Sequence, residues 1–214
     1  VLTDEINRAT PKTQSALLEA MEERQVTVDG VTHLTPRPFL VLATQNPIEY
    51  EGVYPLPEAQ IDRFIMRISI GYPSDSEEKE ILERRKSRKQ EEFEISVIAN
   101  PEKIVEMQKV VEGVHVDDDL ESYMVAVVQA TRNLTKVEVG ASPRGSLALM
   151  HLARAGAVLQ GRDYAVPDDV KSICIPALSH RLILKAGSWL AGVKAEQVIE
   201  DILSRVATPK VMKR

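Results

Sequence analysis

The sequence predicts two structural regions, an α/β segment over residues 1–72 and an all-α domain over residues 73–214. Two observations support this division. Before the Gly71–Pro73 turn, short apolar runs alternate with helical patterns, which is typical of α/β proteins. After that turn, almost every pattern has helical spacing and begins at a capping residue or a proline.

The α/β segment opens with the end of an apolar strand at residues 1–4. Thr10 then has the position of a helix cap, with a proline at the first helical position, and the apolar spacing that follows predicts a helix over residues 11–23. Residues 25–34 predict a β-hairpin with an Asp-Gly pair at its centre, because both positions of a two-residue turn must accept a positive φ.

The rest of the α/β segment predicts two more strands. The continuous apolar run Phe39–Ala43 is typical of a strand that is buried on both faces. Residues 46–57 contain several prolines and predict a loop. A short helix over residues 58–63 then leads into a strand over Phe64–Ile70.

The all-α domain begins with a capping box, in which Ser74 and Glu77 open a helix that runs to about Lys89. The basic run at residues 84–89 is flanked by glutamates and has no aromatic neighbours, which favours a solvated helix face over a nucleic-acid patch. Gly161 is expected to end one of the later helices. These later helices are predicted at about 101–112, 118–133, 143–159, 167–185 and 194–206.

The composition excludes several classes of protein. A net charge of −5 gives no global indication of nucleic-acid binding. The single cysteine, Cys174, excludes an internal disulfide and suits a reducing, cytoplasmic location. The four histidines have no zinc-ligand spacing. No apolar stretch approaches the ~20 residues of a membrane-spanning helix, so we expect no membrane insertion.

Polar side chains follow two of the predicted strands. Asp4 and Glu5 come after the first strand, and Asn46 comes after the second apolar run. Ligands of open α/β sheets bind at such strand ends, where one acid can orient a magnesium-bound water and a second can polarise an attacking water. The amide of Asn46 could hold the same water. The alternatives are a solvated strand end with a helix cap, and an ordinary turn residue before a proline.

Two arginines could supply the positive charge that phosphoryl transfer needs. Arg63 ends the short helix, and its planar, always charged guanidinium can stabilise a phosphate, including one from a neighbouring subunit. Arg144 lies in the first turn of a helix, where a cation is mildly unfavourable, which hints at an anion there. The alternatives are an intrahelical partner of Asp62 or Glu58 for Arg63, and a tolerated surface arginine for Arg144.

The sequence contains no G-x-x-x-x-G-K-[S/T] phosphate-binding loop. The chain also lacks an initiator methionine, and its first residues have the character of a strand end. We therefore expect a piece of a longer protein, whose phosphate-binding loop lies upstream of Val1. We expect the fragment alone to be inactive in nucleotide hydrolysis, because its candidate acids and arginines have no cradle for the phosphates.

Four stretches, taken together, resemble the AAA+ ATPases and specifically the MoxR family. The resemblance implies an α/β remnant of an AAA+ P-loop NTPase core over residues 1–72, with an incomplete parallel sheet, and an all-α AAA+ lid over residues 73–214. Because one central strand is absent, we expect the remnant to be unable to hold the full sheet, and the helical part to fold independently. The four stretches are TDEINRATPKTQ (3–14), ATQNP (43–47), YPLPEAQIDRF (54–64) and GASPR (140–144).

The same resemblance implies a role for each candidate residue, with ATP and Mg²⁺ as cofactors. Asp4 and Glu5 would be the Walker B acids, Asp4 holding Mg²⁺ through water and Glu5 acting as a catalytic residue. Asn46 would be sensor 1, Arg63 the arginine finger and Arg144 sensor 2, all three catalytic. Asp4, Asn46 and Arg144 would also bind the nucleotide.

At the level of function, the resemblance implies a chaperone-like motor that remodels or matures client proteins. It would form a homo-oligomeric, hexameric ring and work with a von Willebrand A-type partner. The hairpin at residues 25–34 would be the insertion before sensor 1 that marks the wider clade of MoxR proteins, magnesium chelatases and replicative helicases. The alternatives are a chelatase-like or helicase-like motor with the same hairpin, and a non-catalytic interaction module. Nucleic-acid binding is not expected, because the hairpin tip is Asp-Gly and carries no basic residue.

Overall fold

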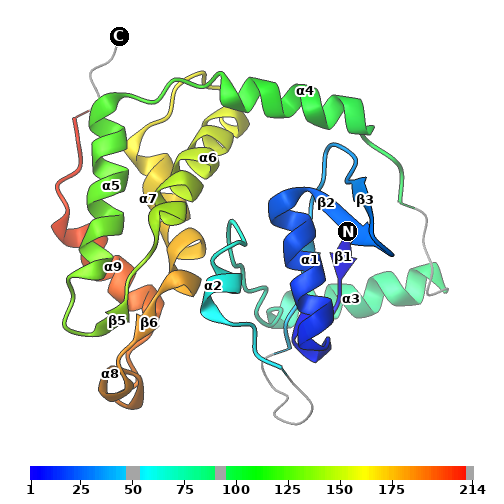
Figure 1. Cartoon of the computed structure of the whole chain (residues 1–214), viewed down its shortest axis with the longest axis horizontal. Helices are drawn as coiled ribbons and strands as arrows, with labels where there is room; N and C mark the ends of the chain where they lie inside the picture. Colours follow the sequence, from blue (N-terminus) through cyan, green and yellow to red (C-terminus); the bar gives the residue numbers. More distant parts are fainter. Residues whose placement is uncertain (47–53, 90–94, 211–214) are drawn as a thin grey trace.

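The computed structural model of the chain describes residues 1–46, 54–89 and 95–210. Figure 1 shows the α/β elements beside the helical elements, with α2 between them and α4 crossing from one side to the other. The helices are α1 (Pro11–Glu23), α2 (Glu58–Ile61), α3 (Asp75–Arg88), α4 (Pro101–Glu112), α5 (Asp118–Arg132), α6 (Pro143–Leu159), α7 (Pro167–Leu178), α8 (Ala186–Leu190) and α9 (Ala195–Arg205), with 3₁₀ turns η1 (Ile6–Arg8) and η2 (Ser179–Arg181). The strands are β1 (Leu2–Thr3), β2 (Gln25–Val28), β3 (Val31–Leu34), β4 (Leu42–Ala43), β5 (Val137–Val139) and β6 (Ile183–Leu184).

The first strand pairs with the second apolar run as a short parallel sheet of β1 and β4. Backbone hydrogen bonds from Leu42 N to Val1 O (2.9 Å) and from Thr44 N to Thr3 O (3.0 Å) fix the register. The prediction of a strand over residues 39–43 that is buried on both faces was wrong, because β4 is shorter and Leu42 is 57% exposed. A two-stranded sheet leaves both faces of such a strand largely uncovered.

The predicted strand over residues 64–70 is not formed, and Ile70 is 95% exposed. Strand geometry requires a hydrogen-bonded neighbour, and this segment pairs with none of the described strands. It turns instead toward the helical region, where Arg67 N donates to Pro176 O at 2.8 Å. The incomplete parallel sheet predicted from the sequence is confirmed. The predicted loop at residues 46–57 lies mostly outside the described residues.

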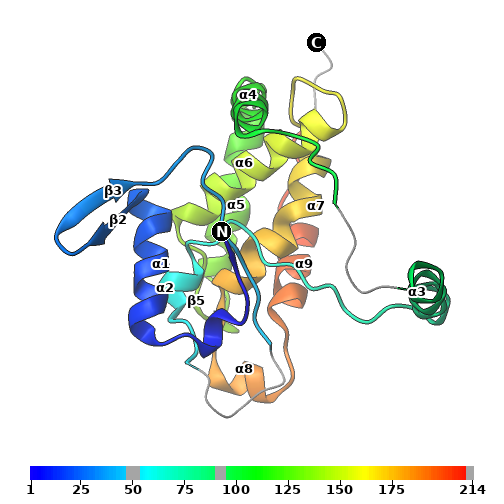
Figure 2. The ribbon, with the colours of Figure 1, turned by 90° about the vertical axis from the view of Figure 1, so that its right-hand side faces the viewer.

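The hairpin of β2 and β3 is antiparallel, as predicted, and it projects from the end of α1 (Figure 2). Its turn residues Asp29 (φ 51°) and Gly30 (φ 79°) both lie in the left-handed region. Helix α1 begins where predicted, with the Thr10 side chain accepting a hydrogen bond from Thr13 N. A small apolar cluster beneath α1 is the core of this region; its buried members are Ile6, Leu18 and Leu56.

Helix α3 has the predicted capping box, in which Ser74 and Glu77 bond each other's backbone N–H groups. All of its residues are exposed, and Figure 2 shows it apart from the other helices. This placement agrees with the prediction that the basic run at residues 84–89 is a solvated face.

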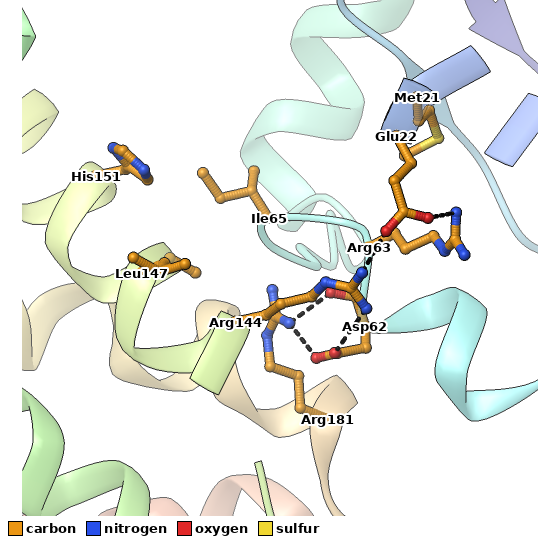
Figure 3. Close-up of a pocket in the computed structure, with 10 residues that line it drawn as sticks. Met21, Glu22, Asp62, Arg63, Ile65, Arg144, Leu147, His151 and Arg181 are labelled. Atoms are coloured by element: carbon orange, nitrogen blue, oxygen red, sulfur yellow. Dashed lines mark hydrogen bonds and ion pairs between the residues drawn. The ribbon is translucent and has the colours of Figure 1, made fainter. Parts of the chain in front are cut away.

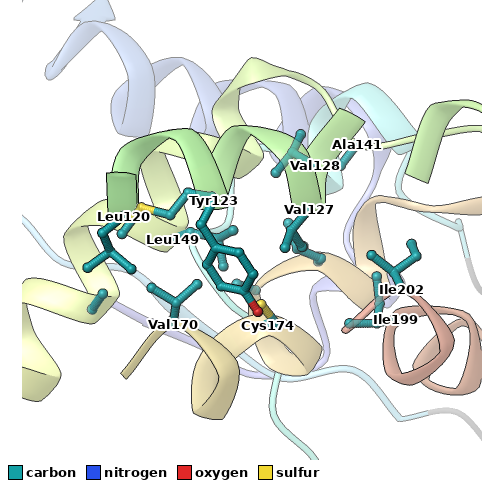
Figure 4. Close-up of a cluster of buried hydrophobic side chains, with 14 of the residues drawn as sticks. Leu120, Tyr123, Val127, Val128, Ala141, Leu149, Val170, Cys174, Ile199 and Ile202 are labelled. Carbon is teal, nitrogen blue, oxygen red and sulfur yellow. The ribbon is translucent and has the colours of Figure 1, made fainter. Parts of the chain in front are cut away.

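The helical region has one large apolar core, built from α5, α6, α7 and α9 (Figure 4). Leu149, Val170 and Ile199 are fully buried within it. Cys174 is also buried, and this burial raises the pKa of its thiol to about 12, which makes it an unreactive core residue. Among the described residues, no helix combines the length and the apolar character that crossing a membrane requires.

The prediction of one helix over residues 167–185 was wrong at its carboxyl end. Helix α7 ends at Leu178, and the chain continues as η2 and then as β6, which pairs with β5. Ser179, His180 and Arg181 are all buried, and tertiary contacts of this turn outweigh its helical pattern. Helices α3, α4, α5, α6 and α9 begin and end within about one residue of their predicted bounds, and Gly161 (φ 70°) follows the end of α6. Helix α8 was not predicted.

Candidate functional site

Asp4 and Glu5 leave the carboxyl end of β1 beside Thr44, which follows β4. The Thr44 hydroxyl donates to a carboxylate oxygen of Asp4 and accepts a hydrogen bond from Glu5 N at 2.8 Å. One threonine therefore ties the two strand ends together. Thr44 was not among the residues predicted from the sequence, although its hydroxyl, two positions before Asn46, was a signal for it.

Glu5 occupies a left-handed backbone conformation (φ 49°, ψ 54°), which is unusual for a residue with a side chain. It stands at the cap position of η1, but its side chain makes no capping hydrogen bond. Its carboxylate instead pairs with Arg8, with 3.1 Å between Oε2 and Nε. The ion pair with Arg8 therefore sets the position of the Glu5 carboxylate near the strand end.

Asn46 lies at the same edge of the sheet and is partly buried. Its carbonyl oxygen accepts a hydrogen bond from Asn7 Nδ2 at 3.4 Å. The Asn7 Oδ1 atom is buried and has no hydrogen-bond partner among the described residues. The structure thus brings Asp4, Glu5 and Asn46 to one end of the β1–β4 sheet, and we call this set, with Thr44, the acidic cluster.

Arg63 and Arg144 meet at a different place, on the carboxylate of Glu22 near the end of α1 (Figure 3). Arg63 pairs with Oε2 of Glu22, and Arg144 Nη2 lies 2.5 Å from Oε1. Arg63 also donates to the carbonyl of Leu18 at 3.2 Å. The suggested intrahelical pairing of Arg63 with Asp62 or Glu58 is therefore not what the structure shows. Arg63, Arg144 and Glu22 form what we call the arginine cluster.

Asp62, the residue before Arg63, connects this cluster to the helical region. Ser142 Oγ donates to Asp62 Oδ2 at 2.8 Å, and Arg144 Nη1 lies 3.6 Å from the same oxygen. Arg181 Nη1 donates to the Asp62 carboxylate and to its carbonyl oxygen, the latter at 2.6 Å. The Arg181 side chain is only 2% exposed, and this burial lowers its pKa against the opposing effect of Asp62.

A second set of bonds fixes the backbone that follows Arg63. Arg181 Nη2 donates to the carbonyl of Phe64 at 2.8 Å, and His180 Nε2 donates to the same oxygen at 3.1 Å. Burial lowers the pKa of His180 to about 4, so its ring is neutral at neutral pH and Nε2 carries the proton. The turn η2 therefore determines where Arg63 lies relative to α6.

The arginine cluster lines an open cavity of about 280 Å³ between α1 and α6. The α6 wall presents Leu147 and His151, and Ile65 lies on the opposite side (Figure 3). Cationic donors beside an apolar wall can bind a polyanion that carries an apolar group.

Two family models match the chain in the order predicted. A model of the ATPase family associated with various cellular activities matches residues 1–66, and an AAA lid domain model matches residues 129–202. The chain is also similar to a crystal structure of a presumed ATPase from Cytophaga hutchinsonii, with a TM-score of 0.91 and 39% identity over 98% of this chain and 66% of that one. An α/β core followed by this lid defines the class of AAA+ ATPases.

Two relatives narrow the class. The chain is 50% identical to the uncharacterized protein YeaC of Bacillus subtilis, covering 98% of this chain and 65% of that protein. It is 44% identical to the chaperone MoxR1 of Mycobacterium tuberculosis, covering 99% of this chain and 58% of that protein. The chain belongs to the MoxR family of AAA+ ATPases, which confirms the resemblance and the fold class. It spans less than two thirds of the length of either relative.

Proposed function

We propose that this chain is the part of a MoxR-type motor that completes an ATP-hydrolysis site. Residues 1–72 would belong to the ATPase core and residues 73–214 to its lid. The observation that carries the proposal is the acidic cluster, in which Asp4, Glu5 and Asn46 lie at one end of a parallel sheet. The phosphates would bind to a loop that this sequence does not contain.

The donor set at the strand ends fits a magnesium–nucleotide complex. The Asp4 carboxylate uses one oxygen for Thr44 and has the second for a metal-bound water. Bound Mg²⁺ would neutralise charge on the phosphates. Glu5 would polarise the attacking water, and the amide of Asn46 would orient that water.

Arg63 and Arg144 would bind phosphate oxygens together, because both guanidinium groups reach one carboxylate. Because the two arginines meet away from the strand ends, they would contact the nucleotide of a neighbouring subunit rather than that of their own. In a closed homo-oligomeric ring, here proposed as a hexamer, the acidic cluster of one subunit would face the arginine cluster of the next. Client remodelling, a von Willebrand A-type partner and a cytoplasmic location belong to the same proposal.

Replacing Glu5 by glutamine tests this function in the full-length protein, meaning this chain together with the segment that supplies the phosphate-binding loop. We expect ATP binding to be retained and turnover to fall about 10²–10⁴-fold, because the base for the water is lost. Turnover and equilibrium binding of labelled ATP measure the two effects. Glu23→Gln, which removes an exposed carboxylate at the end of α1, is the matched control.

The chain of 214 residues should show no turnover by itself. Hydrolysis by this chain that is lost in the Glu5→Gln variant would contradict the proposal. So would a full-length Glu5→Gln variant that hydrolyses ATP as fast as the Glu23→Gln control.

A further inference from the structure

The carboxylate of Glu22 lies between guanidinium groups from both regions of the molecule (Figure 3). Each of its oxygens pairs with a different arginine, Oε2 with Arg63 and Oε1 with Arg144 at 2.5 Å. All three side chains are partly exposed and line the same cavity. An anion from solution can therefore reach the arginines that Glu22 now occupies.

The local position of Glu22 does not favour a negative charge. It lies in the last turn of α1, where the helix dipole repels anions, Glu23 follows it, and that turn has no basic residue. The two arginines supply the attraction that offsets this repulsion. The placement of the Glu22 carboxylate is thus a tertiary feature, set by Arg63 and Arg144.

A carboxylate that offers one oxygen to each of two guanidinium groups has the same recognition chemistry as two oxygens of a phosphate. The charged side chains that line the cavity are three arginines and two carboxylates: Arg63, Arg144, Arg181, Glu22 and Asp62. Asp62 is engaged by the buried Arg181 and by Ser142, so it is held in place. Glu22 is the anion at this site that can leave, because its partners are the partly exposed arginines.

We infer that Glu22 is an internal substitute for phosphate, which holds Arg63 and Arg144 together until a polyphosphate displaces it. This inference rests on the proposed function for its physiological ligand, the phosphates of a nucleotide. Glu22 acts as a positioning residue and as a competitor for the same two guanidinium groups. Release of Glu22 also breaks the bridge that α1 makes to α6 through Arg144.

Inorganic tripolyphosphate, titrated into the 214-residue chain by calorimetry at low salt, tests the competition. We expect the Glu22→Gln variant to bind tripolyphosphate about tenfold more tightly than the unchanged chain, because two partly exposed ion pairs no longer compete. Glu23→Gln removes an equal charge one position along the helix, where the side chain points about 100° away, and it should give at most a small increase. Arg144→Gln in the Glu22→Gln background should abolish the gain.

Glu22→Ala serves as a second variant, in case the glutamine amide still holds an arginine. The inference is overturned if both Glu22 variants bind tripolyphosphate no more tightly than Glu23→Gln does, or if none of the proteins binds it. The result is separable from the motor proposal. A gain at Glu22 with unaffected turnover in full-length Glu5→Gln would support the competition and refute the motor. If the Glu22 variants show no gain, while full-length Glu5→Gln still binds ATP and loses turnover, the competition is refuted and the motor proposal is supported.

Discussion

The helical region and the α/β region of this chain differ in how they are stabilised. Helices α5, α6, α7 and α9 bury one another's apolar faces in a single large core. The α/β region has a small cluster around Ile6, Leu18 and Leu56, and most of its apolar strand residues remain exposed. Helices satisfy their backbone hydrogen bonds internally, whereas each strand depends on a neighbour. The helical region can therefore form its core from its own helices, whereas the parallel strands of the α/β region form only a two-stranded sheet.

A pair of leucine substitutions gives the largest expected difference between the two regions. Leu149→Ala removes a fully buried side chain of α6 and should lower the free energy of unfolding by about 3 kcal/mol. Leu42→Ala, in the exposed strand β4, should cost roughly 0.5 kcal/mol or less. Urea unfolding followed by circular dichroism measures both values. Equal losses of unfolding free energy would show that Leu42 is buried in the folded protein and would contradict the difference between the two regions.

The free energy of unfolding should depend on pH through His180, which lies at the contact between the two regions. The pKa of His180 is lowered by burial to about 4, from an ordinary value of 6.5. Below pH 6.5 the unfolded chain binds a proton that the folded chain does not, so stability falls as the pH is lowered from 6.5 toward 4. Above pH 6.5 His180 is neutral in both the folded and the unfolded chain, so it causes no loss of stability there.

His180→Gln keeps a donor that can reach the Phe64 carbonyl but does not titrate. Between pH 7 and pH 4.5, the unchanged protein should lose about 2 kcal/mol more unfolding free energy than this variant. Because carboxylates titrate equally in both proteins, the difference between the two unfolding curves isolates the histidine. Parallel losses of stability would mean that His180 is not buried against Phe64.

Much of the fold could be predicted because its signals are local. Thr10, Ser74 and Gly161 mark helix ends next to the residues that they cap or terminate, and the Asp-Gly turn specifies the hairpin by itself. The errors involve segments whose structure is decided elsewhere. Residues 64–70 have strand character without a strand partner, and residues 179–184 have a helical pattern that buried tertiary contacts of Arg181 override.

The candidate site was predictable to a smaller extent. Strand ends placed Asp4, Glu5 and Asn46 on one edge, because parallel strands end together, and the structure agrees. The anions of the arginine cluster could not be inferred from spacing. Glu22 and Asp62 lie on different elements from the arginines that they bind across the cavity, and these pairings exist only in the folded chain. The roles of all these residues in catalysis remain predictions.

The central claim is that the acidic cluster of one subunit and the arginine cluster of the next act on one nucleotide. Mixing full-length Glu5→Gln subunits with full-length Arg63→Ala subunits tests it most directly, since each variant alone should be inactive. In a mixed ring, roughly one interface in four would join an intact acidic cluster to an intact Arg63, and ATP turnover should reappear at about that fraction of the unchanged rate. Mixtures that stay as inactive as the two parents, in rings shown to exchange subunits, would contradict the account.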